Sequence, residues 1–307
     1  MKITILGGGA MGALFGGYLS QANDVTIIDV DPLLVEAIKQ NGVRVQEKDG
    51  SVKNYYPHVE VNAAGMEPSD LIVVFVKAMY SRSALEANRD LIGPDTYLMT
   101  LQNGSGHEET LLSFVDQAHV VIGTTLHNSS LIEPGVVSHG GGGHTYIGCL
   151  EGDVERLQPI ADAFNAGGIE ASTYSKVQYL IWNKMFTNVS ASVLTGVLQC
   201  PLGYISSDPN AWAMCRTLIR EAVDVAAGEG LQFDYAEKEA EVKAVCENAP
   251  NGYTSIYADL RDGRLCEVDT ISGSVVRASR RNGVPAPSHE FVVKLVHAME
   301  GTRRKTI

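Results

Sequence analysis

Lys2-Ile3-Thr4-Ile5-Leu6 runs directly into Gly7-Gly8-Gly9-Ala10-Met11-Gly12, and these eleven residues are the strongest indication of the fold. An apolar strand, a G-x-G-x-x-G turn and a helical segment over residues 13–21 together form the dinucleotide-binding fingerprint in its required context. We expect Gly7 to permit a tight turn, Gly9 to let the backbone approach a pyrophosphate, and Gly12 to allow close packing of helix on strand. Free N–H groups at the helix start attract phosphate. The six residues from Gly7 to Gly12 are therefore predicted to bind the cofactor.

The second strand of the fingerprint ends in an acidic residue, Asp29, at the expected distance from the glycines. A carboxylate there accepts a hydrogen bond from the adenosine ribose 2′-OH and repels a 2′-phosphate, which favours NAD over NADP. Arg44 is the competing signal, because its guanidinium could fold over to meet a phosphate. The sequence predicts NAD or NADP, with a slight preference for NAD.

The composition is that of an ordinary globular protein. The chain has 307 residues, of which 45% are hydrophobic and 20% are charged, so two domains are the default expectation. A net charge of −12 argues against nucleic acid or an anionic membrane as a partner. The five cysteines lack C-x-x-C pairing, which indicates neither a zinc site nor a disulfide framework. With no basic-then-apolar leader at the N-terminus, we expect a cytoplasmic protein.

The first half of the chain alternates strand-like runs with amphipathic segments, as in a parallel sheet covered by helices. Leu71-Ile72-Val73-Val74-Phe75-Val76 is apolar on both faces, which indicates a central strand. Residues from about 174 onward are helical in pattern, with Gly and Pro interruptions. We therefore predict an α/β fold with a Rossmann-type doubly wound sheet over residues 1–172, followed by an all-α domain over residues 173–307. The other strands are expected at residues 3–6, 25–28, 97–101 and 120–125, and a clear helix at 32–40.

A glycine run, residues 140–143, could be mistaken for a second phosphate loop. A phosphate cradle opens a helix, whereas this run lies between two short strand-like segments, so a hairpin turn over residues 135–148 is the better interpretation. His139 and His144 would flank that turn. They lack a third ligand at suitable spacing, and no metal is expected.

Polar side chains share one face of a predicted helix over residues 177–199. Lys184, Asn188 and Ser192 recur at intervals of four, while Trp182 and Phe186 belong to the apolar face. Aligned polar groups of this kind can line a cleft.

Four further segments, in this order behind the fingerprint, resemble the ketopantoate reductase family. They are Val76-Lys77-Ala78-Met79, Leu101-Gln102-Asn103-Gly104, Ile181-Trp182-Asn183-Lys184 with Asn188, and Ser255 through Asp259 to Glu267. The resemblance covers essentially the whole chain. It implies a Rossmann domain, a helical C-terminal domain, a substrate cleft between them, and reduction of a 2-keto acid with a nicotinamide cofactor in pantothenate biosynthesis.

The resemblance also implies roles for individual residues. Lys184 matches the catalytic lysine that donates a proton to the ketone oxygen, and Glu267 matches its glutamate partner at the start of a helical run to Arg281. A cation at a carbonyl oxygen stabilises the alkoxide that develops during reduction, so the chemistry suits Lys184. The remaining matches are polar residues in ligand contact: Lys77 and Asn103 with cofactor, and Asn103, Asn188, Ser255 and Asp259, together with Lys184, with substrate.

Two departures from the family pattern leave the substrate open. Tyr80 stands where the family commonly has Gln, and Ser192 where it has a second Asn. The lead substrate is 2-dehydropantoate (ketopantoate). The alternatives are an NAD-dependent D-2-hydroxy-acid dehydrogenase for branched or aromatic substrates and, more remotely, a non-catalytic nicotinamide sensor, against which the pair Lys184 and Glu267 argues. A homodimer is the candidate assembly.

Overall fold

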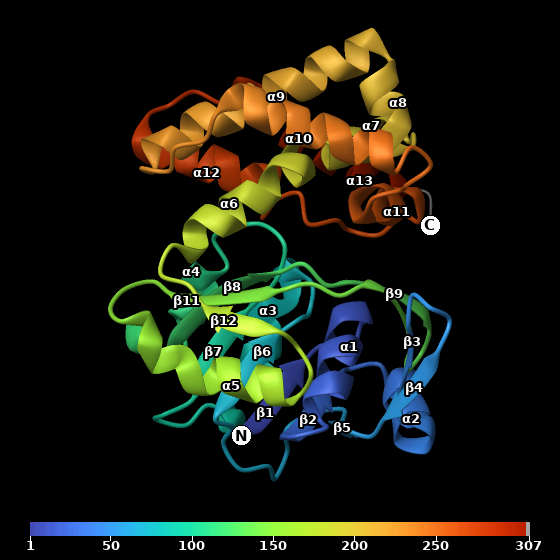
Figure 1. Ribbon diagram of the computed structural model, residues 1–307, viewed down its shortest axis with the longest axis vertical. Helices are drawn as coiled ribbons and strands as arrows, with labels where there is room; N and C mark the ends of the chain where they lie inside the picture. Colours follow the sequence, from blue (N-terminus) through green and yellow to red (C-terminus); the bar gives the residue numbers. More distant parts are fainter. Residues whose placement is uncertain (305–307) are drawn as a thin grey trace. The chain divides into compact units, whose positions relative to one another are not determined.

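The computed structural model describes residues 1–304 and divides the chain into two compact units (Figure 1). The first unit contains residues 1–102 and 107–178, and the second contains residues 103–106 together with those from 179 onward. In the described part of the chain, no helix has the length and apolar character needed to cross a membrane.

The first unit is built on an eight-stranded sheet in the order β12-β11-β8-β7-β6-β1-β2-β5. All neighbouring strands pair in parallel except β8 and β11, which are antiparallel. The predicted doubly wound sheet is confirmed, and the order β5-β2-β1-β6-β7-β8 is the Rossmann order, in which the strand order reverses beside β1. The strands are β1 (Lys2–Leu6), β2 (Asp24–Ile28), β5 (His58–Glu60), β6 (Leu71–Val74), β7 (Tyr97–Thr100), β8 (Val120–Thr125), β11 (Thr145–Cys149) and β12 (Ala171–Thr173).

A second sheet of the first unit, in the order β4-β3-β10-β9, packs against α1 (Ala10–Leu19). Its strands are β3 (Val43–Gln46), β4 (Val52–Tyr55), β9 (Asn128–Glu133) and β10 (Val136–Gly141). The hairpin predicted over residues 135–148 is wrong, because β10 pairs with β9 and β3 whereas β11 pairs with β8 and β12. Val137 of β10 and Ile147 of β11 are both buried in the core of the first unit, so each strand is held by partners distant in sequence and not by the other. The glycine run carries the chain between the two sheets.

Helices cover the main sheet as the sequence pattern predicts. The best-defined is α2 (Pro32–Asn41), where Asp31 caps the first turn by accepting from the N–H of Leu33, Pro32 occupies the first turn, and Gly42 ends the helix at a φ of 70°. The others are α1 (Ala10–Leu19), α3 (Ser81–Ala87), α4 (Glu108–Leu111) and α5 (Gln158–Ala166), with short 3-10 turns η1 (Ala78–Tyr80), η2 (Arg89–Leu91), η3 (Gln117–His119) and η4 (Val154–Leu157).

The second unit is all-helical apart from the short segment 103–106, as predicted. Trp182, Met185 and Phe186 of its first helix are buried in the core, which confirms the apolar face read from the sequence. Its elements are α6 (Val177–Thr187), the π-helical turn η5 (Asn188–Ser192), α7 (Val193–Leu198), α8 (Leu202–Ser207), α9 (Pro209–Gly228), α10 (Tyr235–Asn248), α11 (Ser255–Arg261), α12 (Ser272–Asn282) and α13 (Pro287–Arg304).

Candidate active site

The glycine loop joins β1 to α1 at the point where the strand order reverses. Gly7 has a φ of +100°, and a Cβ there would lie 2.7 Å from the backbone nitrogen of Val76, so only glycine fits. A Cβ on Gly12 would overlap the carbonyl oxygen of Gly7, which is why helix and strand can approach so closely here. Both glycines therefore have the structural tasks that the sequence predicts.

Gly9 differs from its neighbours because a Cβ there would meet no atom within 4 Å. Gly9 is the N-cap residue of α1 and has no side chain that could cap the helix. The backbone N–H groups of the first turn, which includes Ala10 and Met11, therefore receive no hydrogen bond from a capping side chain. Open space in front of an uncapped helix N-terminus suits a pyrophosphate, which would accept these hydrogen bonds. The residues present thus fit a dinucleotide.

Asp29 is held rigidly at the end of β2. Its Oδ2 accepts from the backbone N–H of Gly8 at 2.7 Å, and its Oδ1 accepts from that of Asp31 at 2.9 Å. The carboxylate is partly buried and lies against the glycine loop. Arg44 is paired with Glu133 at 3.0 Å on the second sheet, so its guanidinium is engaged elsewhere.

Lys77 follows β6, one residue beyond the Val76 nitrogen that approaches Gly7. Gln102 was not among the predicted site residues, and its side chain connects the elements of this region. Its Nε2 donates to the carbonyl oxygen of Val76 and, at 2.9 Å, to the hydroxyl of Ser81, while its Oε1 accepts from the hydroxyl of Thr100. Gln102 therefore connects the carboxyl ends of β6 and β7, where ligands bind in open α/β sheets. Its place in the Leu101-to-Gly104 motif was the available signal.

Asn103 begins the short segment that belongs to the second unit. Gly104 has a φ of +101°, and a Cβ there would overlap the carbonyl of Thr270. The same carbonyl accepts from the N–H of Ser105 at 3.0 Å, and Arg277 donates to the Ser105 carbonyl at 3.0 Å. The backbone next to Asn103 is thus fixed to the turn that begins at Glu267.

Lys184 lies on α6 and is partly buried. Burial lowers the pKa of its ammonium to about 8, because the charged form loses hydration. A lysine with that pKa exists substantially in both protonation states near neutral pH, which suits a group that gives up and regains a proton.

The remaining candidates of the second unit lie on η5 and α11. Asn188 is the first residue of η5, and its Oδ1 lies 3.5 Å from the hydroxyl of Ser192. The carbonyl of Ser192 accepts from the hydroxyl of Thr254, the residue that caps α11 immediately before Ser255. The structure therefore brings η5 and the start of α11 together.

Asp259 is buried on α11, and its Oδ1 accepts from Nε of Arg264 at 3.0 Å. Glu267 lies in a turn, and its backbone carbonyl accepts hydrogen bonds from the N–H groups of Thr270 and Ile271. Because α12 begins at Ser272, Glu267 precedes the helix by five residues, and the expectation that it opens the helix is wrong. The hydrogen bonds at its carbonyl stabilise a turn instead.

The two histidines of the glycine run serve hydrogen-bond networks in the first unit. Nδ1 of His139 lies 2.8 Å from Oε2 of Glu47, and its Nε2 lies 3.1 Å from Nδ1 of His127. His144 contacts Glu170 at 3.2 Å and Ser172 at 2.7 Å. Within residues 1–304, no group of three or more His, Cys, Asp or Glu side chains has an arrangement that could hold a metal ion.

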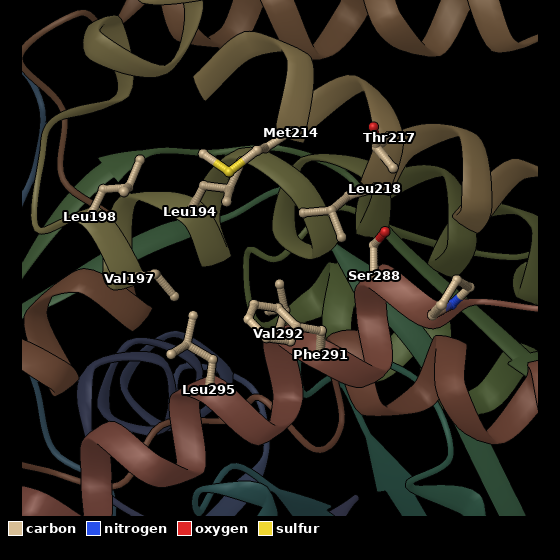
Figure 2. A pocket seen from close by; sticks show the side chains of 11 residues that line it. Leu194, Val197, Leu198, Met214, Thr217, Leu218, Ser288, Phe291, Val292 and Leu295 are labelled. Atoms are coloured by element: carbon tan, nitrogen blue, oxygen red, sulfur yellow. The ribbon is translucent and has the colours of Figure 1, made fainter. Parts of the chain in front are cut away.

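A cavity of about 460 Å³ in the second unit is a different kind of site (Figure 2). Figure 2 shows Leu194 and Met214 across from Phe291 and Leu295 of α13, with Thr217 and Ser288 toward one end. A 2-keto acid carries a carboxylate that needs several donors, so this apolar cavity does not suit it.

Comparisons with known proteins agree with this organisation. The model of ketopantoate reductase PanE/ApbA matches residues 3–152, and the model of its C-terminal domain matches residues 176–300. The chain is similar to a 2-dehydropantoate 2-reductase of Lactococcus lactis, with 32% identity over 98% of each chain, and to that of Halobacterium salinarum, with 30% identity over 96% and 98%.

Among solved structures, it is similar to D-mandelate dehydrogenase with NADH and anilino(oxo)acetate, at 30% identity, 99% and 100% coverage and a TM-score of 0.90. A ketopantoate reductase from Ralstonia eutropha gives 26% identity, 99% and 100% coverage and a TM-score of 0.89. The sequence match over both domains establishes that this chain belongs to the ketopantoate reductase PanE/ApbA family.

Proposed function

We propose that this protein reduces a 2-keto acid to a 2-hydroxy acid with a nicotinamide cofactor, and that its lead substrate is 2-dehydropantoate. The observation that carries the proposal is Lys184, a partly buried lysine with a lowered pKa in a chain of this family that also has the dinucleotide fingerprint. The named relatives at about 30% identity support the choice of substrate.

The proposed reaction needs a hydride and a proton. When bound, the nicotinamide supplies the hydride to the keto carbon. Lys184 donates a hydrogen bond to the keto oxygen and transfers its proton as that oxygen gains negative charge, which yields the alcohol and a neutral amine. The amine regains a proton from solvent before the next turnover.

The other candidate residues are given roles that suit their chemistry. Glu267 is proposed to hold the Lys184 ammonium and the product hydroxyl, because a carboxylate accepts from both. Asn103, Asn188 and Ser255 are proposed to bind substrate oxygens as neutral donors. Asp259 is proposed to act beside them through its partner Arg264, and Lys77 with Asn103 to contact the cofactor.

Substitution of Lys184 tests the proposal. Lys184→Ala is expected to lower turnover by about 10²-fold or more while the dinucleotide still binds, because proton donation is lost and the glycine loop is untouched. Glu267→Gln is expected to lower kcat and raise KM with little change in stability. Normal turnover in folded Lys184→Ala would refute the catalytic assignment.

A second candidate function is oxidation and reduction of aromatic or branched D-2-hydroxy acids with NAD. The likeness to D-mandelate dehydrogenase over 99% of the chain supports it, as does Asp29. Steady-state kcat/KM with ketopantoate, phenylglyoxylate and branched 2-keto acids separates the two functions. A folded protein that binds NADH but reduces none of them would favour the nicotinamide sensor.

Of NAD and NADP, NAD is the proposed cofactor. A 2′-phosphate would lie against the Asp29 carboxylate, and Arg44, the cation that could have met it, is paired with Glu133. The related structure with NADH supports the same choice.

We also propose an assembly, a location and a domain division. Exposed apolar side chains beside the cavity of Figure 2, such as Phe291 and Met214, favour a homodimer, which sedimentation analysis tests. Five free thiols fit a cytoplasmic location. We propose a functional boundary after residue 172, between the Rossmann domain and a helical substrate domain.

A further inference from the structure

Lys238 is a charged residue buried among helices of the second unit, with 2% of its surface exposed. Its ammonium donates to Oδ1 of Asn183 at 2.7 Å and to the two oxygens of Glu241 at 2.8 and 2.7 Å, and lies 5.8 Å from the centre of the Phe233 ring. Burying an ammonium is costly unless its hydrogen bonds are satisfied. The bond to Asn183 reaches from α10 to α6, across 55 residues of sequence.

Asn183 belongs to a stripe on α6 that faces Phe233 and Lys238. Tyr179 stacks on Phe233 at 4.5 Å between ring centres, and Phe186 meets the same ring edge-on at 4.9 Å. Residues 179, 183 and 186 lie on one side of an α-helix, because they are four and three positions apart. Asn183 adds a hydrogen bond from Lys238 to the two ring contacts of this stripe.

The hydrogen bond at Asn183 restrains the rotation of α6 about its axis, together with the core side chains Trp182 and Phe186. Lys184 is the next residue. Consecutive residues of an α-helix point about 100° apart, so the angle at Asn183 sets the direction of Lys184. A rotation of about ten degrees moves the tip of an extended lysine by roughly 1 Å. A displacement of that size at a reacting group can lower the rate by about 10²-fold.

The π-helical turn η5, which follows α6, affects how the rotation of α6 is fixed. η5 is a π-helical turn, which inserts one residue into the helix and shifts the register between α6 and α7. Because of this shift, the position of α7 does not fix the rotation of α6 in the way that one continuous α-helix would. Contacts made by α6 itself set its rotation, and the hydrogen bond from Lys238 is one of them, beside the core packing of Trp182 and Phe186.

We propose that Lys238 is a positioning residue that directs Lys184 toward the substrate by holding Asn183. The proposal rests on the proposed catalytic role of Lys184. It adds a residue from another helix to the machinery, which acts through α6 and touches neither substrate nor cofactor.

Two variants remove the same hydrogen bond from opposite ends. Lys238→Met and Asn183→Leu are each expected to lower kcat about tenfold or more with a smaller change in KM, measured per folded molecule. A freer α6 leaves Lys184 better hydrated, so the decline of kcat/KM at alkaline pH is expected to move upward by about one pH unit. The double variant is expected to lose no more activity than the worse single one, because both remove one interaction.

Lys243→Met is the matched control, since Lys243 lies on the same helix with an exposed side chain. It is expected to leave kcat and the pH profile unchanged. Circular dichroism identifies variants that fail to fold, and either single variant suffices for the test. If Lys238→Met and Asn183→Leu fold, lose stability, and keep both kcat and the pH profile, Lys238 is structural and the inference is overturned. If Lys184→Ala remains active, the proposed function fails instead.

Discussion

Gly8 donates its backbone N–H to Oδ2 of Asp29 at 2.7 Å, which joins the glycine loop to the end of β2. The carboxylate therefore has a defined position relative to the loop that is proposed to hold the pyrophosphate. An acid with that placement can accept from a ribose hydroxyl, and it opposes a phosphate at the same carbon.

The first prediction is a preference for NADH. Placing the 2′-phosphate of NADPH against the Asp29 carboxylate is expected to cost about 1–3 kcal/mol of binding free energy. The kcat/KM with NADH is therefore expected to be roughly ten- to hundredfold higher than with NADPH. Asp29→Asn is expected to reduce that ratio about tenfold. Asp31→Asn removes the same charge two residues away and serves as the control. A clear preference of the unmodified protein for NADPH would contradict the assignment.

The second prediction contrasts two glycines of one loop. Gly9→Val is expected to fold, because its side chain enters open space and the backbone there, with φ of −62° and ψ of −168°, suits any residue. It is expected to weaken NADH binding by about a hundredfold, since the side chain would occupy the place of the pyrophosphate. Calorimetric titration of the folded variant measures the affinity.

Gly12→Ala provides the contrast, because its Cβ would overlap the Gly7 carbonyl. It is expected to destabilise the first unit by about 1–3 kcal/mol or more. Unchanged NADH affinity in Gly9→Val would mean that the open space before α1 is not the binding site.

The first 41 residues were the most predictable part of the molecule. Strand β1, the glycine turn, and helix α2 with its Asp31 cap and Pro32 depend on interactions between residues close in sequence, which leave a local pattern. The core face of α6 was equally readable from its helical spacing.

The second sheet was not predictable, because one of its strand pairings joins segments that are distant in sequence. β10 pairs in parallel with β3, about ninety residues earlier, so this pairing leaves no signal between neighbouring residues. β4 is mostly exposed and lacks an apolar face. Likewise, the π-helical turn after α6 and the bond from Lys238 to Asn183 depend on packing between helices distant in sequence. The turn at Glu267 replaced an expected helix start because its carbonyl is bonded within the turn.

The third prediction concerns the pH dependence of catalysis. Lys184 must be protonated to donate, and its pKa is lowered by burial to about 8. The kcat/KM for reduction is therefore expected to be level below that pH and to fall about tenfold per unit above it. Lys184→Arg, which stays protonated, is expected to abolish the alkaline decline in whatever activity remains. A profile that is level to pH 10 in the unmodified protein would exclude Lys184 as the acid.

The last prediction concerns stability and the buried His289. Its ring is fully buried, with Nε2 3.0 Å from the carbonyl of Leu218 and no hydrogen-bond partner at Nδ1. Burial lowers the pKa of this imidazole below its usual value, because a charge there would lose its hydration. The unfolded chain then binds a proton at a higher pH than the folded one, so stability is retained above about pH 6.5 and is lost as the pH falls below it, by up to about 1.4 kcal/mol per unit.

Urea unfolding at pH 7.5 and 5.5 measures this loss, with the fluorescence of Trp182 and Trp212 as a signal from the second unit. His289→Gln keeps a donor for the Leu218 carbonyl and cannot be protonated, so it is expected to be less stable at pH 7.5 but to lose less stability on acidification. His58→Gln, at an exposed histidine of the first unit, removes a titratable ring without touching a buried site and is the control. If the variant and the unmodified protein lose equal stability between the two pH values, His289 is protonated as readily in the folded state as in the unfolded chain, and the argument from burial is wrong.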